Sequence, residues 1–486
     1  MMTQSVDPRT GTAFGPVLAD TDATTLDAVI DAAATAAPHW AATSRVARAA
    51  ALSAVADRLD AASEKLVELA DSETALGVGR LSGEVARTAF QLRMFATLLG
   101  QADYLPSLLD DEVAGPPPQG RPELRRVLVP LGPVVVFGAS NFPFAFSVAG
   151  GDTASALAAG CPVVVKAHPA HPQLSEAVAA QVLAGLASAG APAGTFALVR
   201  GFEAGRTLVV DPRIRAAAFT GSYEAGRALF DLAVARPDPI PFYGELGSVN
   251  PVFVTPAAAR RGKSLADAYL DSLTAGAGQF CTNPSVLAIP KGSGLLDEII
   301  ASAAGRPPGI FLHEGVANHY RKRLDDLAGI AGARLVVAPV HTDGAGYQAP
   351  LAIVALDADS ALRDVDAFQT ECFGPAGVIL EYDDDAQALA IADSMHGCLV
   401  ATIHGEAGES LAAVLVERLT GIAGRIVWNG WPTGVAVSPA QHHGGPHPST
   451  TSSLHTSIGG AAVDRFVRPV VFQSLPANLL PGAGRS

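Results

Sequence analysis

Two side chains able to do covalent chemistry stand on glycine-rich segments of this chain. Cys281 lies in residues 276–284, GAGQFCTNP, and Glu245 lies upstream in residues 242–247, FYGELG. Glycines let a backbone approach a small substrate closely, and the N–H groups around a cysteine can face an oxyanion. A thiolate can add to a carbonyl, and a carboxylate can then activate water against the resulting thioester. Taken alone, each has a simpler interpretation, because an isolated cysteine is usually a small buried apolar residue.

Length and composition narrow the class of protein. A chain of 486 residues, 49% of them hydrophobic, is long enough for about three domains with sizeable cores. The formal charge of −14 argues against nucleic acid as a partner. Four scattered cysteines without a CxxC pair favour reduced thiols and a cytoplasmic location. We find no signal-peptide pattern and no apolar stretch long enough for a membrane helix, so we expect no membrane partner.

The elements expected along the chain indicate an α/β fold. Apolar spacing predicts helices over residues 22–75 and 83–104, and a stiff Pro/Gly loop follows at 115–122. From residue 134, short buried-type strands alternate with helices, which predicts a doubly wound parallel sheet. Asn141, Lys166 and Gly221 each follow the end of such a strand, where a dinucleotide site is expected. Residues 466–473 read as an edge strand, which would need a partner.

Six ordered features together resemble the aldehyde dehydrogenase superfamily, over nearly the whole chain from residue 9 to about 476. They are residues 137–143 (FGASNFP), Lys166, residues 219–222 (FTGS), Glu245, Cys281 and residues 371–375 (ECFGP). The resemblance implies a Rossmann-like cofactor domain (1–115 plus 130–246) and a second α/β catalytic domain (247–445). It also implies a small β oligomerisation arm (116–129 plus 450–476) in a homodimer or homotetramer.

By this resemblance Cys281 is the nucleophile that forms a thiohemiacetal and then a thioester. The side-chain amide of Asn141 and the N–H of Cys281 would stabilise the developing oxyanion. Glu245 would be the general base, which favours hydrolysis over transfer to coenzyme A. On the residues alone, Asn141 is equally well a turn residue before Phe142.

The remaining features of the resemblance describe a cofactor site. Lys166 would hold the adenosine ribose, and Gly221 and Ser222 would bind pyrophosphate at a helix N-terminus. Glu371 would grip the nicotinamide ribose, and Phe373 would pack beside the ring.

Cofactor choice rests on the segment that follows Lys166. Relatives specific for NAD often carry a glutamate three residues after this lysine, and here that position is Pro169. Arg200 or Arg206 could pair with a 2′-phosphate, so we expect NADP, with NAD also usable. His168 and His171 are interpreted as loop residues, and no metal is expected.

The substrate is indicated by residues 428–435 and 443–446. These segments resemble the branch that oxidises 2-oxoglutarate semialdehyde (2,5-dioxopentanoate) and a related NADP-dependent fatty aldehyde dehydrogenase. The tunnel walls would be Phe142, Trp431, Pro432 and Val435. Arg93 would bind a distal carboxylate unless it is simply an exposed helical arginine, and His443 would assist proton transfer unless it is structural. The alternatives are an aliphatic or fatty aldehyde substrate, or a non-catalytic binding protein on the same fold.

Overall fold

The computed structural model describes residues 2–340 and 344–479 of the chain. Its N-terminal part is an antiparallel ribbon followed by three helices: β1 (Met2–Asp7), β2 (Thr12–Ala19), α1 (Ala23–Ala42), α2 (Arg45–Thr74) and α3 (Val78–Leu99). The expected helix over 22–75 is therefore two helices. The break lies at an extended Thr43 followed by Ser44, whose side chain accepts a hydrogen bond from the Ala47 N–H and so begins α2. Ala75, in the left-handed conformation, ends α2.

The first large sheet has five parallel strands in the order β7-β6-β5-β8-β9, which confirms the doubly wound arrangement. The strands are β5 (Val134–Phe137), β6 (Val163–Lys166), β7 (Phe196–Val199), β8 (Ala216–Thr220) and β9 (Phe242–Glu245). The helices that connect them are α4 (Gly151–Ala159), α5 (Pro172–Ser188), α6 (Phe202–Val210) and α7 (Tyr223–Val234).

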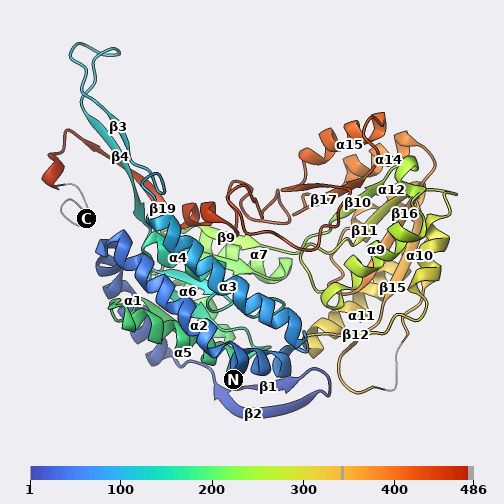
Figure 1. Cartoon of the computed structure of the whole chain (residues 1–486), viewed down its shortest axis with the longest axis horizontal. Helices are drawn as coiled ribbons and strands as arrows, with labels where there is room; N and C mark the ends of the chain where they lie inside the picture. The colour runs from blue at the N-terminus through green and yellow to red at the C-terminus, as the bar shows by residue number, and fades with distance from the viewer. Residues whose placement is uncertain (1, 341–343, 480–486) are drawn as a thin grey trace.

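Both faces of this sheet are covered, which explains its uninterrupted valine runs. Val134 and Val136 pack with α2, α3, α4 and α5, whereas Val135 faces α1, α6 and α7 on the other side. Figure 1 shows these helices around the blue and green half of the molecule.

The second large sheet has seven strands in the order β13-β15-β16-β11-β10-β17-β18 and stands beside the first (Figure 1). All neighbours are parallel except β13 and β15. The strands are β10 (Pro251–Val254), β11 (Val286–Pro290), β13 (Arg334–Val337), β15 (Ala352–Asp357), β16 (Ala376–Tyr382), β17 (Ala401–His404) and β18 (Ile426–Trp428). One face is covered by α9 (Lys263–Thr274) and α10 (Leu295–Ala303). The other is covered by α11 (Glu314–Ala328), α12 (Ala358–Arg363), α14 (Asp385–Ser394) and α15 (Ser410–Thr420).

The remaining elements are short. They are α8 (Pro256–Ala259), α13 (Val365–Phe368), the paired strands β12 (Gly309–Ile310) and β14 (Gln348–Ala349), and the 3-10 turns Ala275–Gly278, Gly460–Phe466 and Ala477–Leu479. No helix in the described ranges is long and apolar enough to cross a membrane. All four cysteines are unpaired.

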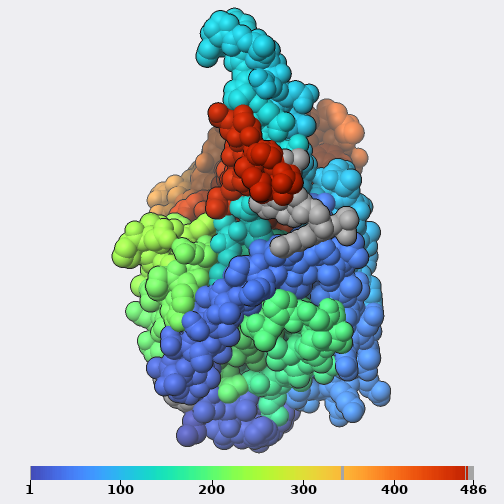
Figure 2. All heavy atoms as spheres, turned by 90° about the vertical axis from the view of Figure 1, so that its left-hand side faces the viewer, coloured from blue at the N-terminus to red at the C-terminus, as the bar shows by residue number. Residues whose placement is uncertain are grey.

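A small antiparallel sheet projects from the first body, in the order β19-β4-β3 (Figures 1 and 2). It contains β3 (Leu108–Asp110), β4 (Leu124–Pro130) and β19 (Val467–Gln473). β19 pairs with β4 over its whole length, so the strand expected at 466–473 exists, and its other edge carries the exposed Val471. The predicted division of the chain into three domains, and the use of this sheet in assembly, stay predictions.

The side chain of Glu73 on α2 links the N-terminal ribbon to α5, and replacing it tests this link. Its buried carboxylate accepts hydrogen bonds from the Ser5 hydroxyl and from the N–H groups of Gln173 and Leu174, at 3.0 and 2.9 Å. Glu73→Ala leaves these donors unpaired, so we expect a loss of stability on the order of 3 kcal/mol. Thermal and urea unfolding measure this loss. Glu68→Ala, at an exposed position on the same helix, is the control and should change stability little. Equal effects of the two substitutions would contradict the role of Glu73.

Candidate active site

A cavity of about 800 Å³ lies between the two large sheets. Its walls come from segments that follow β5, β6, β8 and β9 of the first sheet and from segments that precede β11, β16 and β17 of the second. The carboxyl ends of parallel strands are where such sheets bind ligands. The cavity brings together six of the residues selected from the sequence: Asn141, Gly221, Ser222, Cys281, Glu371 and Phe373.

The loop that carries Cys281 is shaped by its glycines. Gly276, Ala277 and Gly278 all have positive φ, and a Cβ on Gly278 would lie 2.2 Å from the backbone of Gly374. Only glycine therefore lets the cysteine loop touch the segment that carries Glu371. The Asn250 side chain fixes the loop from the other side by donating to the Cys281 carbonyl at 2.8 Å.

Asn141 lies buried beside this loop. Its Nδ2 donates to the Gln279 carbonyl at 3.0 Å, which occupies one of its two amide hydrogens. The other hydrogen can serve an oxygen bound at Cys281, as the proposed oxyanion role requires.

Cys281, His443 and Glu245 form a series of polar contacts in which Glu245 and His443 are buried and Cys281 is partly exposed to the cavity. The Cys281 sulfur lies 3.7 Å from His443 Nε2, and the same nitrogen lies 2.9 Å from Glu245 Oε1. The Ser457 hydroxyl donates to the other oxygen of Glu245 at 2.9 Å. The sulfur, ring nitrogen and carboxylate oxygen all lie within 4.8 Å of one another. Glu245 itself lines a small second cavity with His443, Ser457 and the end of β8.

The Cys281 thiol and the Glu245 carboxyl have pKa values shifted in opposite directions. Burial and then the Glu245 carboxylate raise the pKa of the Cys281 thiol well above its ordinary value. Burial also raises the pKa of the Glu245 carboxyl, but the interactions with His443 and Ser457 outweigh it and leave that pKa below its usual value. At neutral pH the thiol is therefore protonated and the carboxylate ionised, so activation of the sulfur requires removal of a proton.

The part of the cavity away from Cys281 fits an elongated anionic cofactor. Ser222 caps the N-terminus of α7 by accepting from the Ala225 N–H at 3.4 Å, and Gly221 precedes it. A Cβ on Gly221 would lie 2.6 Å from the Phe219 ring, so this turn depends on glycine. Helix N-termini bind phosphates through their free N–H groups.

Glu371 stands near the reactive end of the same cavity. Its Oε1 accepts from the Ser248 N–H at 3.3 Å, and a Cβ on Gly247 would lie 2.6 Å from its Oε2. Burial, together with the charges of Glu224 and Glu245, raises the pKa of this carboxyl to about 8. A partly exposed carboxyl that lines the cavity suits a ligand with hydroxyl groups, as a ribose has. The residues present therefore fit a dinucleotide.

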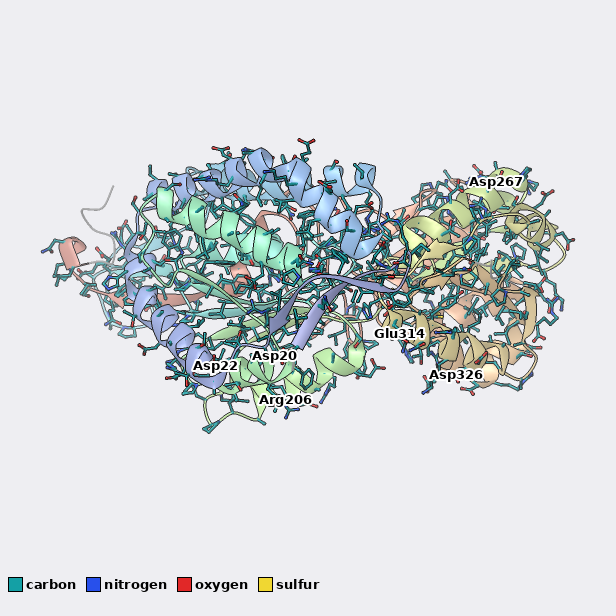
Figure 3. All side chains as sticks on the ribbon, turned by 90° about the horizontal axis from the view of Figure 1, so that it is seen from below. Asp20, Asp22, Arg206, Asp267, Glu314 and Asp326 are labelled. Atoms are coloured by element: carbon teal, nitrogen blue, oxygen red, sulfur yellow. The ribbon has the colours of Figure 1, made fainter. Side chains whose placement is uncertain are left out.

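Lys166 does not line this cavity. It ends β6, where burial lowers the pKa of its ammonium and the carboxylate of Asp20 acts in the opposite direction. Asp20 comes from the link between β2 and α1 and lies in the same part of Figure 3 as Arg206. The structure thus brings a carboxylate close to Lys166 although none stands at position 169. Arg200 is already paired with Glu176.

The predicted substrate-binding residues lie in three different surroundings. Phe142 lies at the cysteine loop, with its ring 5.3 Å from that of Phe280. Trp431 packs on the core of the second sheet, 4.6 Å from the His404 ring, and neither it nor Pro432 lines the large cavity. Arg93 is not brought to the site. It is half-exposed on α3 and forms ion pairs with Asp57 and Asp60 at 2.6 and 2.7 Å.

Several residues at the site were missed from the sequence. Ser457 gave no signal, because an isolated serine has no motif, and Asn250 had no role assigned although it follows the Glu245 segment. Arg80 and Arg87 could have been noticed, since they are seven residues apart on the helix that carries Arg93. Arg80 Nη2 donates to the Asn141 carbonyl at 2.6 Å.

Comparison with known proteins decides the family. A model of the aldehyde dehydrogenase family matches residues 2–306 and 322–469. The chain belongs to the aldehyde dehydrogenase family. It is an NAD(P)-dependent aldehyde dehydrogenase, which confirms the resemblance seen in its motifs and removes the support for a non-catalytic protein.

Two relatives share much of the sequence. The chain is 45% identical over 444 residues to alpha-ketoglutaric semialdehyde dehydrogenase 2 of Azospirillum brasilense, covering 90% of this chain and 84% of that protein. It is 40% identical over 439 residues to alpha-ketoglutaric semialdehyde dehydrogenase of Acinetobacter baylyi, covering 89% and 83%.

Solved structures share the fold. A Thermus 1-pyrroline-5-carboxylate dehydrogenase with bound NAD has a TM-score of 0.81 at 20% identity, covering 97% of this chain and 90% of that one. An NAD-dependent aldehyde dehydrogenase from Sinorhizobium meliloti has a TM-score of 0.82 at 23% identity, covering 98% and 92%.

The raised pKa of the Cys281 thiol can be tested by alkylation. Because the Glu245 carboxylate contributes to the rise, Glu245→Gln should lower this pKa and move the iodoacetamide rate profile to lower pH. We expect the variant to be labelled several-fold faster at neutral pH, as measured by mass spectrometry of the Cys281 peptide. Cys281→Ser reports any labelling of the three other, buried cysteines. A profile that is unchanged or moves to higher pH would show that Glu245 does not act on the thiol.

Proposed function

We propose that this enzyme oxidises 2-oxoglutarate semialdehyde to 2-oxoglutarate through a thioester on Cys281. The observation that carries the chemistry is the buried contact of Cys281, His443 and Glu245 at one end of a cavity that fits a dinucleotide. The substrate is supported by the two relatives at 45% and 40% identity, which are both named for this semialdehyde.

The reaction begins with removal of the thiol proton. Because His443 Nε2 donates its hydrogen to the ionised Glu245 carboxylate at 2.9 Å, this nitrogen has no free lone pair for the thiol proton, which instead passes to solvent through the cavity that Cys281 lines. The thiolate adds to the aldehyde carbon, a C–S bond forms, and the former carbonyl oxygen gains negative charge. The amide of Asn141 and the backbone N–H of Cys281 donate to that oxygen. Loss of one such donor costs roughly 100-fold to 1000-fold in rate.

A bound NAD(P)⁺ supplies the acceptor for the hydride that leaves the substrate carbon. The thioester that remains on Cys281 is then hydrolysed. Glu245 takes a proton from the attacking water, the C–S bond breaks, and the carboxylic acid and the thiol are released. Ser457 holds the Glu245 carboxylate in position by its hydrogen bond. In balance, one aldehyde and one water give one carboxylate, one hydride transferred and two protons.

An aliphatic aldehyde is the second candidate substrate. The rings of Phe142, Phe146 and Phe280 stand together beside the cysteine loop, at centroid distances of 5.5 and 5.3 Å from Phe142. Such a wall would also accept a hydrocarbon chain.

The assembly is the remaining part of the proposal. We infer a homodimer or homotetramer through the free edge of β19, since an exposed edge strand with an apolar residue favours pairing. The cytoplasmic location expected from the unpaired cysteines also stays a prediction.

A panel of aldehydes tests the substrate. We expect kcat/KM, followed by absorbance of the reduced nicotinamide, to be highest for 2-oxoglutarate semialdehyde, lower for succinate semialdehyde and lowest for hexanal. Cys281→Ser should lose activity on all three, and Glu245→Gln should retain a first turnover but lose steady-state hydrolysis. A preference for hexanal would overturn the proposed substrate. Full steady-state activity of Glu245→Gln would overturn its role as base.

Cofactor preference can be tested at Asp20. The sequence favours NADP because of Pro169, but the Asp20 carboxylate near Lys166 opposes a second negative charge there. Asp20→Asn should therefore raise the ratio of kcat/KM for NADP over NAD by roughly tenfold, equal to about 1.4 kcal/mol. Asp57→Asn removes the same charge from an exposed site on α2 and should leave the ratio unchanged. An unchanged ratio in Asp20→Asn would show that this carboxylate does not face the cofactor.

A further inference from the structure

Helix α3 presents two arginines toward the reactive centre and a third away from it. With about 100° of rotation per residue, Arg80 and Arg87 lie about 20° apart around the helix, whereas Arg93 lies about 120° from Arg87. The contacts follow this geometry. Arg93 pairs with Asp57 and Asp60 at the surface, while Arg80 and Arg87 lie against aromatic rings of the cysteine pocket.

Arg80 is fixed against the cysteine loop. Its guanidinium carbon lies 5.0 Å from the centre of the Phe142 ring and 4.8 Å from that of Phe280. A Cβ on Gly276 would lie 2.4 Å from its Nη1. Its Nη2 donates to the Asn141 carbonyl, but Nη1 is buried and has no hydrogen-bond partner in the described chain.

Arg87 lies seven residues after Arg80 on the same face of α3, and its guanidinium packs over the Phe146 ring. Its guanidinium carbon is 5.9 Å from that ring, and the ring is 6.3 Å from the ring of His443. Both Nε and Nη2 of Arg87 are buried, and neither has an acceptor among the described residues. These two nitrogens form one edge of the guanidinium, which is the fork that matches the two oxygens of a carboxylate.

The nearby carboxylate does not satisfy the two arginines. Glu84 lies between them on α3, and its charge acts on both guanidiniums. Its Oε1 accepts from the N–H groups of Phe144 and Ala145, at 2.8 and 3.0 Å, and its buried Oε2 has no hydrogen-bond partner among the described residues. Within residues 2–340 and 344–479, neither Arg80 nor Arg87 forms an ion pair within 4 Å. Buried guanidinium nitrogens without an acceptor are costly, so an anion bound from outside would stabilise them.

A third arginine near the sulfur is not available for this purpose. Arg425 donates to the carbonyls of Gly434 and Pro432 at 2.9 and 2.6 Å, so its guanidinium holds the loop that carries Trp431.

We propose that Arg87, assisted by Nη1 of Arg80, binds the distal carboxylate of the substrate and sets the preference of this enzyme for acidic aldehydes. This inference rests on the proposed function, since it assumes an aldehyde held at Cys281. It places the role first assigned to Arg93 six residues earlier on the same helix. The three phenylalanines then pack along the carbon chain between the aldehyde and the carboxylate.

The kinetic test compares two variants with a matched control. Arg87→Met should raise KM for 2-oxoglutarate semialdehyde on the order of 100-fold and change kcat/KM for hexanal less than about threefold. Arg87→Lys keeps the charge but loses the fork and should recover only part of the affinity. Arg93→Met, on the same helix, should behave like the wild type. An equal loss on both aldehydes would overturn the proposal and assign Arg87 to stabilising the thiolate.

A binding test separates this inference from the proposed function. Glutarate, a five-carbon dicarboxylate, should inhibit hexanal oxidation competitively and raise the melting temperature of the wild type, whereas pentanol should do neither. Both effects of glutarate should disappear in Arg87→Met, with cofactor-induced stabilisation retained as proof of folding. A wild type that ignores glutarate would overturn the anion site. A wild type that binds glutarate through Arg87 but does not oxidise the semialdehyde would overturn only the proposed substrate.

Discussion

The hydrogen bond between His443 and Glu245 is the contact on which the site depends, because it joins segments that belong to different parts of the molecule. Glu245 ends strand β9 of the first sheet, and Cys281 precedes strand β11 of the second. His443 comes from a return segment of the chain, which is tied to the first sheet by the hydrogen bond from Leu246 N–H to the Ser449 carbonyl at 2.8 Å. A displacement of one sheet of about 1 Å would separate the sulfur from the His443–Glu245 pair, and misplacements of this size have large effects on catalysis.

Burial of this contact acts on the Glu245 carboxyl and the Cys281 thiol alike. It raises the pKa of the Glu245 carboxyl, but the interactions with His443 and Ser457 outweigh it and keep this carboxylate ionised inside the protein. It also makes a thiolate unfavourable, and the same carboxylate adds to that cost. The resting thiol is therefore protonated, and the Asn141 side chain lies buried against the same loop. The position of Asn141 is in turn held by Arg80 and by the Glu84 hydrogen bonds to the following loop.

The sequence was sufficient where a function sits in a short contiguous motif. The valine runs gave the parallel sheet, since both faces are buried, and the glycine-rich segments located Cys281, Glu245 and the α7 turn. The sequence was insufficient where a role depends on which face of a helix meets a neighbour. Arg93 and Arg87 have the same chemistry and lie on the same helix, and only the packing of α3 on the cysteine loop distinguishes them. The same limit applies to Asp20, which reaches Lys166 only through the turn before α1, and to Ser457, which no motif marks.

An anionic substrate can bind only if positive groups near the site outweigh the negative charge of the whole protein. The chain carries a formal charge of −14, and Glu245 and Glu371 both lie beside Cys281, so a carboxylate substrate meets repulsion on average. At physiological ionic strength, however, exposed charges more than about 8 Å away are largely screened. Buried groups are screened much less, so the guanidiniums of Arg80 and Arg87 and the buried carboxylates of Glu84 and Glu245 act most strongly on a bound substrate. Under the proposed role, the positive charge that meets the substrate is that of Arg87 beside the cysteine loop, whereas the charge of Arg93 at the surface is neutralised by two aspartates.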